Sequence, residues 1–294
     1  MIESAFDIVI TGLILGGLYA LIAVGLSLQY GVGRVLNVSH GEFIILAALV
    51  TYSLYTVTGI HPLVAIAFIA PALFVVGFVL DRTIFNDLRR TSVNEDHFEG
   101  RSLLVSFGLL FVIQNLMLMF WGAGLRGYSV LNTPVEILGN RYGLNRVIAL
   151  VVAVTASVGF YLFIRHTRVG KAIRAAAERP DMAEALGVNR KRVLAICFGL
   201  GAGLAGLAGV LHSMMFGIQA SRGIELTVIA IVVVVVGGLG SITGSLIGGF
   251  LLGLVIAVVN FIDPSLSLVA FYLIFILVLL VRPAGIFGRQ IHAD

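Results

Sequence analysis

Residues 226–236 read LTVIAIVVVVV, and residues 270–281 read AFYLIFILVLLV. Neither run alternates polar and apolar side chains, as the strands of a membrane β-barrel do over segments of about ten residues. Both are continuous apolar runs, which are typical of bilayer-spanning helices of about 20 mostly apolar residues. The composition agrees, because 59% of the 294 residues are hydrophobic and only 12% are charged, against about 25% charged in soluble domains. We therefore predict an all-α integral membrane protein.

Similar runs elsewhere predict about eight transmembrane helices. We expect spans near residues 8–29, 42–58, 63–81, 102–121, 146–164, 193–215 and 266–281. The remaining apolar region, 226–260, is too long for one crossing, and we interpret it as two helices or a re-entrant hairpin meeting at GGLGSITGS (237–245). Broken helices are tolerated in a membrane only where protein or water satisfies the freed backbone groups. In transporters they often mark the pathway.

Positive charge is concentrated in one connection, residues 165–192. This connection holds eight of the chain's 19 lysines and arginines. Since cytoplasmic loops of membrane proteins carry an excess of Lys and Arg, we predict that this loop is cytoplasmic. The acidic N-terminus then lies outside, and the C-terminus lies in the cytoplasm. The basic charge of the chain therefore indicates membrane orientation and does not point to a nucleic-acid partner.

The same loop, RHTRVGKAIRAAAERPDMAEALGVNRKR, has the signals of two short helices. In the first, Lys171, Arg174 and Glu178 fall at helical spacing around the alanine run 175–177. Pro180 suits the first position of the second helix, Asp181 its positive end, and Gly187 its C-terminal cap. An apolar side of that second helix would consist of Met182, Ala185 and Leu186. A short helix with an apolar side is a format for docking onto another protein, and the alternative is an ordinary solvated basic loop. The residues that we expect to couple this segment to an ATPase partner are Arg174, Glu178, Asp181, Ala185 and Gly187.

The stretch GLGAGLAGLAG (199–209) has the glycine spacing of a dinucleotide-binding fingerprint. That fingerprint requires a strand before it, whereas this stretch lies inside a predicted span. We interpret it as a small-residue face for helix packing, with Gly199 and Gly203 in GxxxG spacing. The sequence has no GxxxxGK[ST] phosphate-binding loop. We expect this chain to bind no cofactor and no metal and to have no enzymatic activity of its own.

A polar cluster, LNVSHGEF (36–43), lies between the first two apolar runs. The topology above places it at the cytoplasmic end of these spans. Ser39 would be the N-cap of the second helix, and Glu42, three residues on, would complete a capping box. The polar residues that we consider for a substrate pathway or gate are Asn37, Ser39, His40, Gln114, Asn115, Ser241 and Thr243. For the adjacent pair on the fourth span, the alternative is hydrogen bonding between helices.

Four blocks carry a resemblance to a known family. They are GLSLQYGVGRVLNVSHGEF (25–43), RVGKAIRAAAERPDMAEALGVNRKRV (168–193) followed by GLAGLAGVL, GGLGSITGSLIGGFLLG (237–253) and LVLLVRPAGIFGR (277–289). In this order, the blocks resemble the permease subunits of branched-chain amino-acid ATP-binding-cassette (ABC) importers, and in particular the smaller, H-type permease. The likeness extends over nearly the whole chain, which would form a single permease domain.

The resemblance implies a permease in the bacterial inner membrane. It also implies a second homologous permease subunit, two ATPase subunits that use ATP and Mg, and an extracytoplasmic substrate-binding protein. The family also serves urea and short amides, so these substrates are an alternative to amino acids. An alternative of another class is a stand-alone channel or ion-coupled carrier. Such a carrier usually needs ionisable groups at membrane depth, and beyond Glu42 the predicted spans contain almost none.

Overall fold

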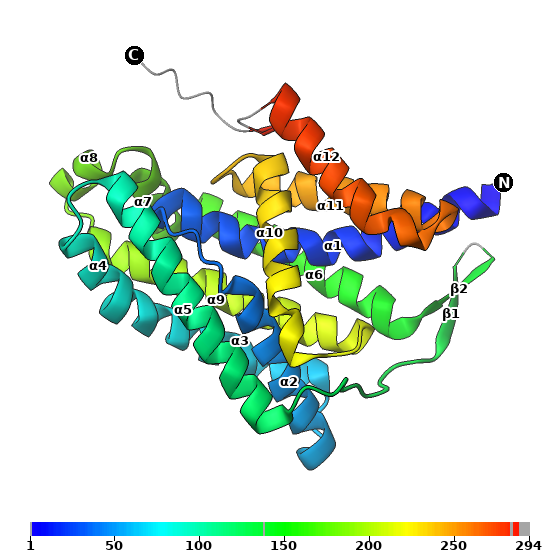
Figure 1. Ribbon diagram of the computed structural model, residues 1–294. Coiled ribbons are helices and arrows are strands. Elements are labelled where there is room, and N and C mark those ends of the chain that lie inside the picture. Colours follow the sequence, from blue (N-terminus) through cyan, green and yellow to red (C-terminus); the bar gives the residue numbers. More distant parts are fainter. Residues whose placement is uncertain (1, 138, 283–284, 288–294) are drawn as a thin grey trace.

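The computed structural model describes residues 2–137, 139–282 and 285–287, and the fold is almost entirely helical (Figure 1). The helices are α1 (Ile2–Gly33), α2 (His40–Thr58), α3 (Pro62–Leu80), α4 (Asn86–Arg90), α5 (Glu95–Trp121), α6 (Leu144–His166), α7 (Arg168–Glu178), α8 (Pro180–Ala185), α9 (Arg190–Met215), α10 (Gly223–Gly237), α11 (Ile242–Ile262) and α12 (Ser267–Val281). A π-helical turn, Asp81–Phe85, joins α3 to α4, and 3-10 turns Ala220–Arg222 and Pro264–Leu266 precede α10 and α12. The predicted all-α class is confirmed.

Nine stretches of the described residues are long and apolar enough to cross a membrane. Each predicted span coincides with one of them, although the third and fourth extend further toward the basic connection between them, as Pro62–Arg90 against the predicted 63–81 and Glu95–Trp121 against the predicted 102–121. The count exceeds the predicted eight because the apolar region 226–260 divides into α10 and α11, with residues 238–241 between them. The prediction of a segment broken within residues 237–245 is therefore confirmed.

The break between α10 and α11 is closed by the chain's last described residues. The carbonyl oxygens of Val236 and Gly237, at the end of α10, accept hydrogen bonds from the N–H groups of Ile286 and Phe287 at 2.9 and 3.1 Å. On the other side of the break, Ser241 caps α11 and accepts a bond from Gly244 N–H at 3.0 Å. These bonds satisfy backbone groups that a broken helix would otherwise leave unpaired. The resembling block 277–289 lies partly outside the described residues.

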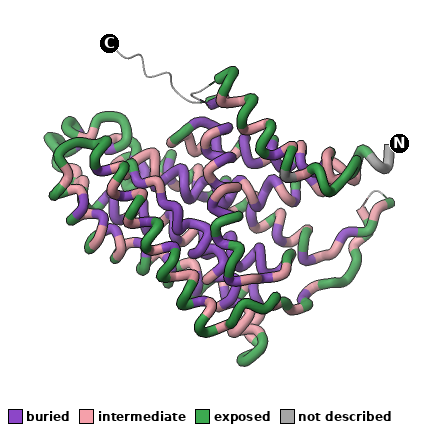
Figure 2. Tube along the Cα trace, viewed as in Figure 1, coloured by how far each residue is buried: buried purple, intermediate pink, exposed green. Residues whose placement is uncertain are grey.

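Helices α1 and α9 form the centre of the bundle, where the trace in Figure 2 is mostly buried. Glycines let α1 approach α11 closely, since a Cβ on Gly12 would lie 2.8 Å from the Cα of Leu254, and one on Gly16 would lie 2.8 Å from the Cα of Phe250. In α9, a Cβ on Gly199 would lie 2.8 Å from the Phe74 carbonyl oxygen of α3. The glycine-rich stretch 199–209 is thus a helix-packing face, as predicted.

Helices α3, α5, α6 and α12 form the outer layer. In the most apolar 18 residues of each span, only 17% are buried in α5 and 6% in Pro264–Val281, which includes α12, against 72% in α9. The side chains that these outer helices expose are large and apolar, for example Phe68 on α3, Phe111 on α5 and Leu273 on α12. Such a surface suits contact with lipid or with other membrane-spanning chains.

The bundle has two distinct ends (Figure 1). One end, hereafter the basic end, carries α4, α7, α8 and the basic connection 165–192. The opposite end carries the start of α1 and an antiparallel hairpin of β1 (Pro134–Ile137) and β2 (Asn140–Gly143), in which Pro134 pairs with Gly143. Tyr142 ties this hairpin to α1, because its hydroxyl donates to Asp7 Oδ1 at 2.9 Å. Burial, and the bond to Asp7, raise the pKa of Tyr142, so the hydroxyl keeps its proton.

Candidate functional site

The connection 165–192 folds into two short helices, as the sequence predicts. Thr167 precedes α7 and caps it, because its hydroxyl oxygen accepts a hydrogen bond from Gly170 N–H at 3.0 Å. Arg174, on the exposed side of α7, donates to the carbonyl oxygen of Arg165 at 3.1 Å. Glu178 is the last residue of α7 and is exposed. Both predicted coupling residues of this helix therefore lie on an accessible surface.

The second helix, α8, begins and ends with the residues that its local sequence favours. Pro180 is its first residue and Asp181 lies in its first turn. Gly187 has a φ of 87°, the left-handed conformation that glycine adopts most easily. Around it, Val188 N–H donates to Ala183 O at 3.0 Å and Gly187 N–H to Glu184 O at 2.9 Å. This pair of bonds is a Schellman motif, a common helix end with glycine in that position.

Helix α8 presents an apolar surface away from the bundle. Ala183 faces inward and is 3% exposed, whereas Met182 is 59% and Leu186 86% exposed. Ala185, a predicted coupling residue, is also exposed. A hollow of about 350 Å³ lies between α7 and α8, and its lining includes Glu178, Met182 and Leu186. The arrangement offers a short helix and an adjoining hollow to another protein.

A second hollow joins α7 to the break between α10 and α11. Its volume is about 370 Å³. Arg174 and Glu178 line it from α7, while Ser241 and Thr243 line it from the start of α11. Gly31, near the end of α1, also lines it, and a Cβ at this position would lie 2.8 Å from the Cα of Gly240. The structure thus brings two of the predicted coupling residues beside two of the predicted pathway residues.

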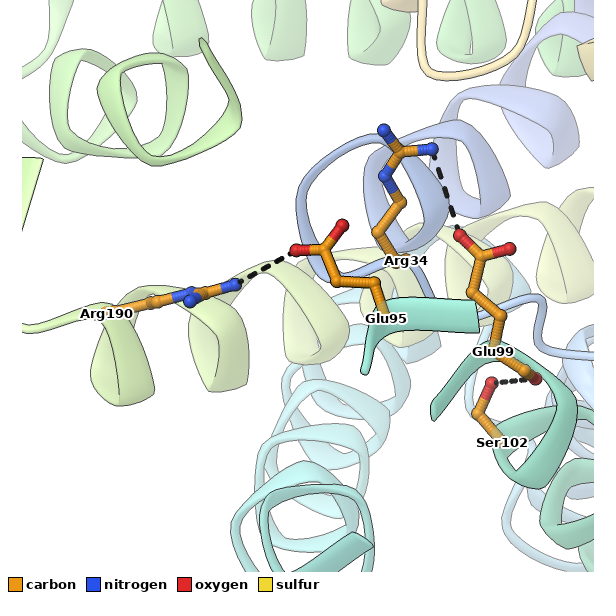
Figure 3. A network of polar contacts seen from close by, with 5 residues as sticks. All are labelled: Arg34, Glu95, Glu99, Ser102 and Arg190. Carbon is orange, nitrogen blue, oxygen red and sulfur yellow. Dashed lines mark hydrogen bonds and ion pairs between the residues drawn. The ribbon is translucent and has the colours of Figure 1, made fainter. Parts of the chain in front are cut away.

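Ion pairs hold three helix ends together on the same basic end (Figure 3). Arg34, just after α1, lies 3.8 Å from Glu99 of α5, and Arg190, the first residue of α9, lies 3.9 Å from Glu95. The hydroxyl of Ser102 donates to the carbonyl oxygen of Glu99 at 2.8 Å. These pairs are partly exposed, and pairs of this kind contribute about 0–1 kcal/mol each. They orient the ends of α1, α5 and α9 beside α8 without fixing them strongly.

The polar cluster 36–43 lies inside the bundle, and its predicted position at a cytoplasmic helix end is wrong. After Arg34 the chain turns back along α1, so that α2 begins beside the interior of that helix. His40 Nε2 lies 3.1 Å from the carbonyl oxygen of Ile22, about three turns before α1 ends at Gly33. Asn37 Nδ2 donates to Gln29 Oε1 at 3.1 Å. The sequence did not indicate this depth, because an apolar run shows where a span continues and not where its helix begins.

The predicted capping box at the start of α2 is also wrong. Ser39 does occupy the N-cap position, but its side chain makes no capping bond. Its hydroxyl donates instead to Asn37 Oδ1 at 2.6 Å. The carboxylate of Glu42 has no hydrogen-bond partner among the described residues and is fully buried. The Ser39 hydroxyl therefore bonds to the neighbouring Asn37 amide instead of capping α2, and the expected capping box does not form.

Two residues that the sequence analysis did not select complete this cluster. Gln29 joins it to α9, because its Nε2 donates to the carbonyl oxygen of Phe198 at 3.2 Å. Thr227 of α10 joins it to the start of α2, since its hydroxyl accepts from Gly41 N–H at 2.8 Å and donates to Val38 O at 2.9 Å. Both are polar residues inside apolar runs, and this isolation is the signal that could have found them.

The remaining predicted pathway residues do not join the cluster. Asn115 is exposed on α5, and its Nδ2 donates within its own helix to Phe111 O at 2.8 Å. Gln114 beside it is half-buried, and Thr243 is exposed at the basic end. The seven candidates therefore fall into three separate places: the buried cluster, the outer face of α5 and the hollow at the break.

Metal-binding chemistry is not concentrated anywhere in the described part of the chain. No group of three or more His, Cys, Asp or Glu side chains there is placed to hold a metal ion. Cys197, the single cysteine of the sequence, is buried in α9.

Comparison with known proteins gives one consistent result. The family model described as branched-chain amino acid transport system, permease component, matches residues 8–279. The chain is 32% identical to the high-affinity branched-chain amino acid transport system permease protein LivH of Salmonella typhimurium, over 95% of this chain and 94% of the relative. It is 30% identical to the corresponding permease protein BraD of Pseudomonas aeruginosa, over the same shares of the two chains. No solved structure matches the chain significantly.

Proposed function

The chain belongs to the family of branched-chain amino-acid transport system permease components, and from this membership we propose that it is the membrane-spanning permease subunit of an ABC importer for branched-chain amino acids. The nine stretches of the described residues that are long and apolar enough to cross a membrane would provide the transmembrane part. The single observation that carries the coupling role is the hollow in which Arg174 and Glu178 of α7 face Ser241 and Thr243 at the α10–α11 break. It puts an exposed helical segment in direct reach of a break in the membrane-spanning region.

In this proposal, ATP hydrolysis takes place on separate subunits. Two ATPase subunits, which use ATP and Mg, dock on α7 and α8 through the exposed apolar surface around Met182 and Leu186. Closure of the ATPase dimer pushes this segment. The residues that line the hollow between α7 and the α10–α11 break pass the movement on to residues 238–241. The proposed coupling residues are the two hollow-lining residues of α7 together with Asp181, Ala185 and Gly187.

The proposed function also includes an orientation of the chain in the membrane and two further partners. We place the basic end in the cytoplasm, because excess Lys and Arg mark cytoplasmic loops, and the N-terminus and the β1–β2 hairpin on the outer side of a bacterial inner membrane. A substrate-binding protein delivers the amino acid to that outer side. A second homologous permease subunit covers part of the exposed apolar outer layer of α3, α5, α6 and α12.

The test of the coupling role is the substitution Gly187→Val. A β-branched residue at a φ of 87° is strained, so the turn after α8 has to change, although a Cβ there would meet no atom within 4 Å. In proteoliposomes that contain the complete transporter, we expect ATP hydrolysis to continue while leucine uptake falls at least tenfold. Uptake and ATP hydrolysis are measured on the same preparation.

The matched control is Gly187→Asn, because asparagine adopts the left-handed conformation far more readily than valine. We expect this variant to keep most of the uptake. Normal uptake by the valine variant at normal abundance would contradict the coupling role of α8. Uptake by vesicles that lack the ATPase subunits would contradict the importer proposal as a whole and would favour a self-sufficient carrier.

A further inference from the structure

A pocket of about 340 Å³ lies at the basic end, where the end of α1 and the turn between α4 and α5 meet the start of α9. Its volume is at the lower end of the roughly 300–1,000 Å³ of small-ligand sites. Two of its lining side chains, Glu95 and Glu184, are anionic, and both are exposed. Five are cationic, so the lining carries a net positive charge: Arg34, Arg89, Arg90, Arg190 and Lys191.

Arg89 is the least exposed of these cations, with a side chain that is 18% exposed. Its Nη2 donates to Asp81 Oδ1 at 2.8 Å, and its guanidinium carbon lies 5.0 Å from the centre of the Phe98 ring. Its Nη1 makes no hydrogen bond to the described residues and is not enclosed. The contacts therefore hold one planar guanidinium group in place with donors to spare, and such a group suits the oxygens of a phosphate.

The ion pairs of the other four cations are loose or absent. Arg34 and Arg190 lie 3.8 and 3.9 Å from glutamates of α5, and in Figure 3 these two arginines flank Glu95. Exposed pairs of this kind are weak, so a ligand anion can replace the glutamates. Arg90 and Lys191 are exposed and form no ion pair within the described ranges.

The first residues of two long helices also line the pocket. Glu95 begins the 27-residue α5, and Arg190 begins the 26-residue α9. Asn94 and Asn189 each cap the third N–H group of their helix, and the first two N–H groups make no hydrogen bond to the described residues. Such N-termini carry a partial positive charge and bind anions. The end of α1 adds the opposite partial charge, which Arg34, the next residue, offsets.

We propose that this pocket binds a phosphate group, carried by the headgroup of an anionic lipid or by a soluble phosphate compound. The phosphate oxygens accept from Arg89 and from the free N–H groups of the two helix starts, while Arg90 and Lys191 add positive charge. Basic pockets between membrane-spanning helices at a cytoplasmic surface bind lipid headgroups in this way. The ordinary excess of basic residues in cytoplasmic loops requires neither a cavity nor an oriented guanidinium group. A bound phosphate ties the ends of α1, α5 and α9 together beside α8, whatever the chain transports.

The test compares two double variants that remove the same charge from the basic end. The pocket variant combines Arg90→Gln with Lys191→Gln. The matched control variant combines Arg168→Gln with Arg192→Gln, two exposed cations that do not line the pocket. Arg89 is left in place, because its removal would leave a buried carboxylate without its partner. Equal unfolding midpoints of the two variants in neutral phosphatidylcholine nanodiscs show that both keep the fold.

Both arms of the test use the full-length chain without ATPase subunits, which bind phosphate compounds themselves. In the lipid arm, native mass spectrometry compares the phosphatidylglycerol and the phosphatidylcholine that the chain retains from an equal mixture. In the soluble arm, calorimetry measures the binding of inorganic phosphate to the chain in phosphatidylcholine nanodiscs. In each arm in which the unmodified chain binds, we expect the pocket variant to bind at least tenfold less and the control variant to stay within twofold.

The two arms identify the source of the phosphate group. Binding in the lipid arm identifies a headgroup and binding in the soluble arm a soluble compound, and either supports the site when only the pocket variant loses it. Equal losses in the two variants overturn the site, because the effect then belongs to the basic end in general. Absence of binding by the unmodified chain in both arms also overturns it. If the pocket variant then also loses the ATPase subunits in the complete transporter, the cations act in contact with that partner.

Discussion

The buried start of α2 and the exposed coupling segment α7–α8 are both polar, glycine-containing interruptions of an apolar chain, yet they are stabilised in opposite ways. In the first, Asn37, Ser39, His40 and Glu42 are all fully buried. In the second, local hydrogen bonds define the helix ends, and the polar side chains such as Arg174 and Glu178 face outward. The difference teaches that polar residues in a membrane protein mark either a tightly packed junction or a contact surface, and that only the packing distinguishes the two.

The glycines of the two regions show the contrast most clearly. A Cβ on Gly41 would overlap the carbonyl oxygen of Gly223 and lie 2.6 Å from Thr227 Oγ1. A Cβ on Gly187 would meet nothing within 4 Å, but the backbone there is left-handed. Glycine is therefore needed at position 41 because neighbouring atoms leave no room for a Cβ, and at position 187 because the backbone is left-handed.

The strongest test of this comparison is Gly41→Ala. The atoms that the new methyl group would meet belong to the α10 backbone and a buried hydroxyl, so a change of side-chain rotamer cannot relieve the overlap. Overpacking typically costs about 1–3 kcal/mol, and we expect a cost at or above about 3 kcal/mol here. The measurement is the thermal unfolding midpoint of the purified complex, which we expect to fall by roughly 10 °C.

The control for this substitution is Gly108→Ala, within α5. A Cβ at Gly108 meets nothing within 4 Å, and alanine is the better helix former by about 1 kcal/mol. We expect an unchanged or slightly higher midpoint. An equal loss of stability in both variants would mean that the contact between Gly41 and Gly223 is not what makes the start of α2 sensitive.

A smaller effect is expected from Asn37→Ala. The Asn37 side chain accepts from Ser39 N–H at 3.2 Å and from its hydroxyl at 2.6 Å, and it donates to Gln29. Its removal breaks these three hydrogen bonds, each of which contributes a net stabilisation of about 0.5–1.5 kcal/mol. We expect a loss of about 2 kcal/mol, measured as the same unfolding midpoint.

The matched variant is Asn115→Ala, which loses only a bond to its own helix on an exposed face. Its midpoint should stay within the range of a surface substitution, about 0.5 kcal/mol. If the two variants lost the same stability, the buried cluster would contribute no more than an exposed intrahelical bond.

Much of the fold could be predicted from the sequence, because long apolar runs and capping residues act locally. The second span was predicted to begin at residue 42, and α2 begins at His40. Pro180 and Gly187 indicated both ends of α8. The β1–β2 hairpin was not predicted, since its strands have four residues each and occur in a short connection without a clear alternating pattern.

The site could be predicted only in part, because its pockets depend on which helices become neighbours. Arg174 and Glu178 were selected for coupling and Ser241 for the pathway, but nothing local indicated that they line one hollow.

The smallest effect on stability, and the sharpest test of the exposed region, is expected from Leu186→Asp. Leu186 is 86% exposed, so its replacement should change the free energy of unfolding by no more than about 0.5 kcal/mol. A charge in the apolar surface of α8 should, however, prevent the ATPase subunits from copurifying, because an unpaired charge is costly to bury in an interface.

The control is Val93→Asp, a position 89% exposed in the connection between α4 and α5 on the same end. This variant should keep both the unfolding midpoint and the ATPase subunits. Loss of the ATPase subunits in both variants would assign the effect to added negative charge on the basic end in general. Loss in Leu186→Asp alone, with the midpoint unchanged, would show that this surface of α8 acts in docking and not in folding, the reverse of what Gly41→Ala tests.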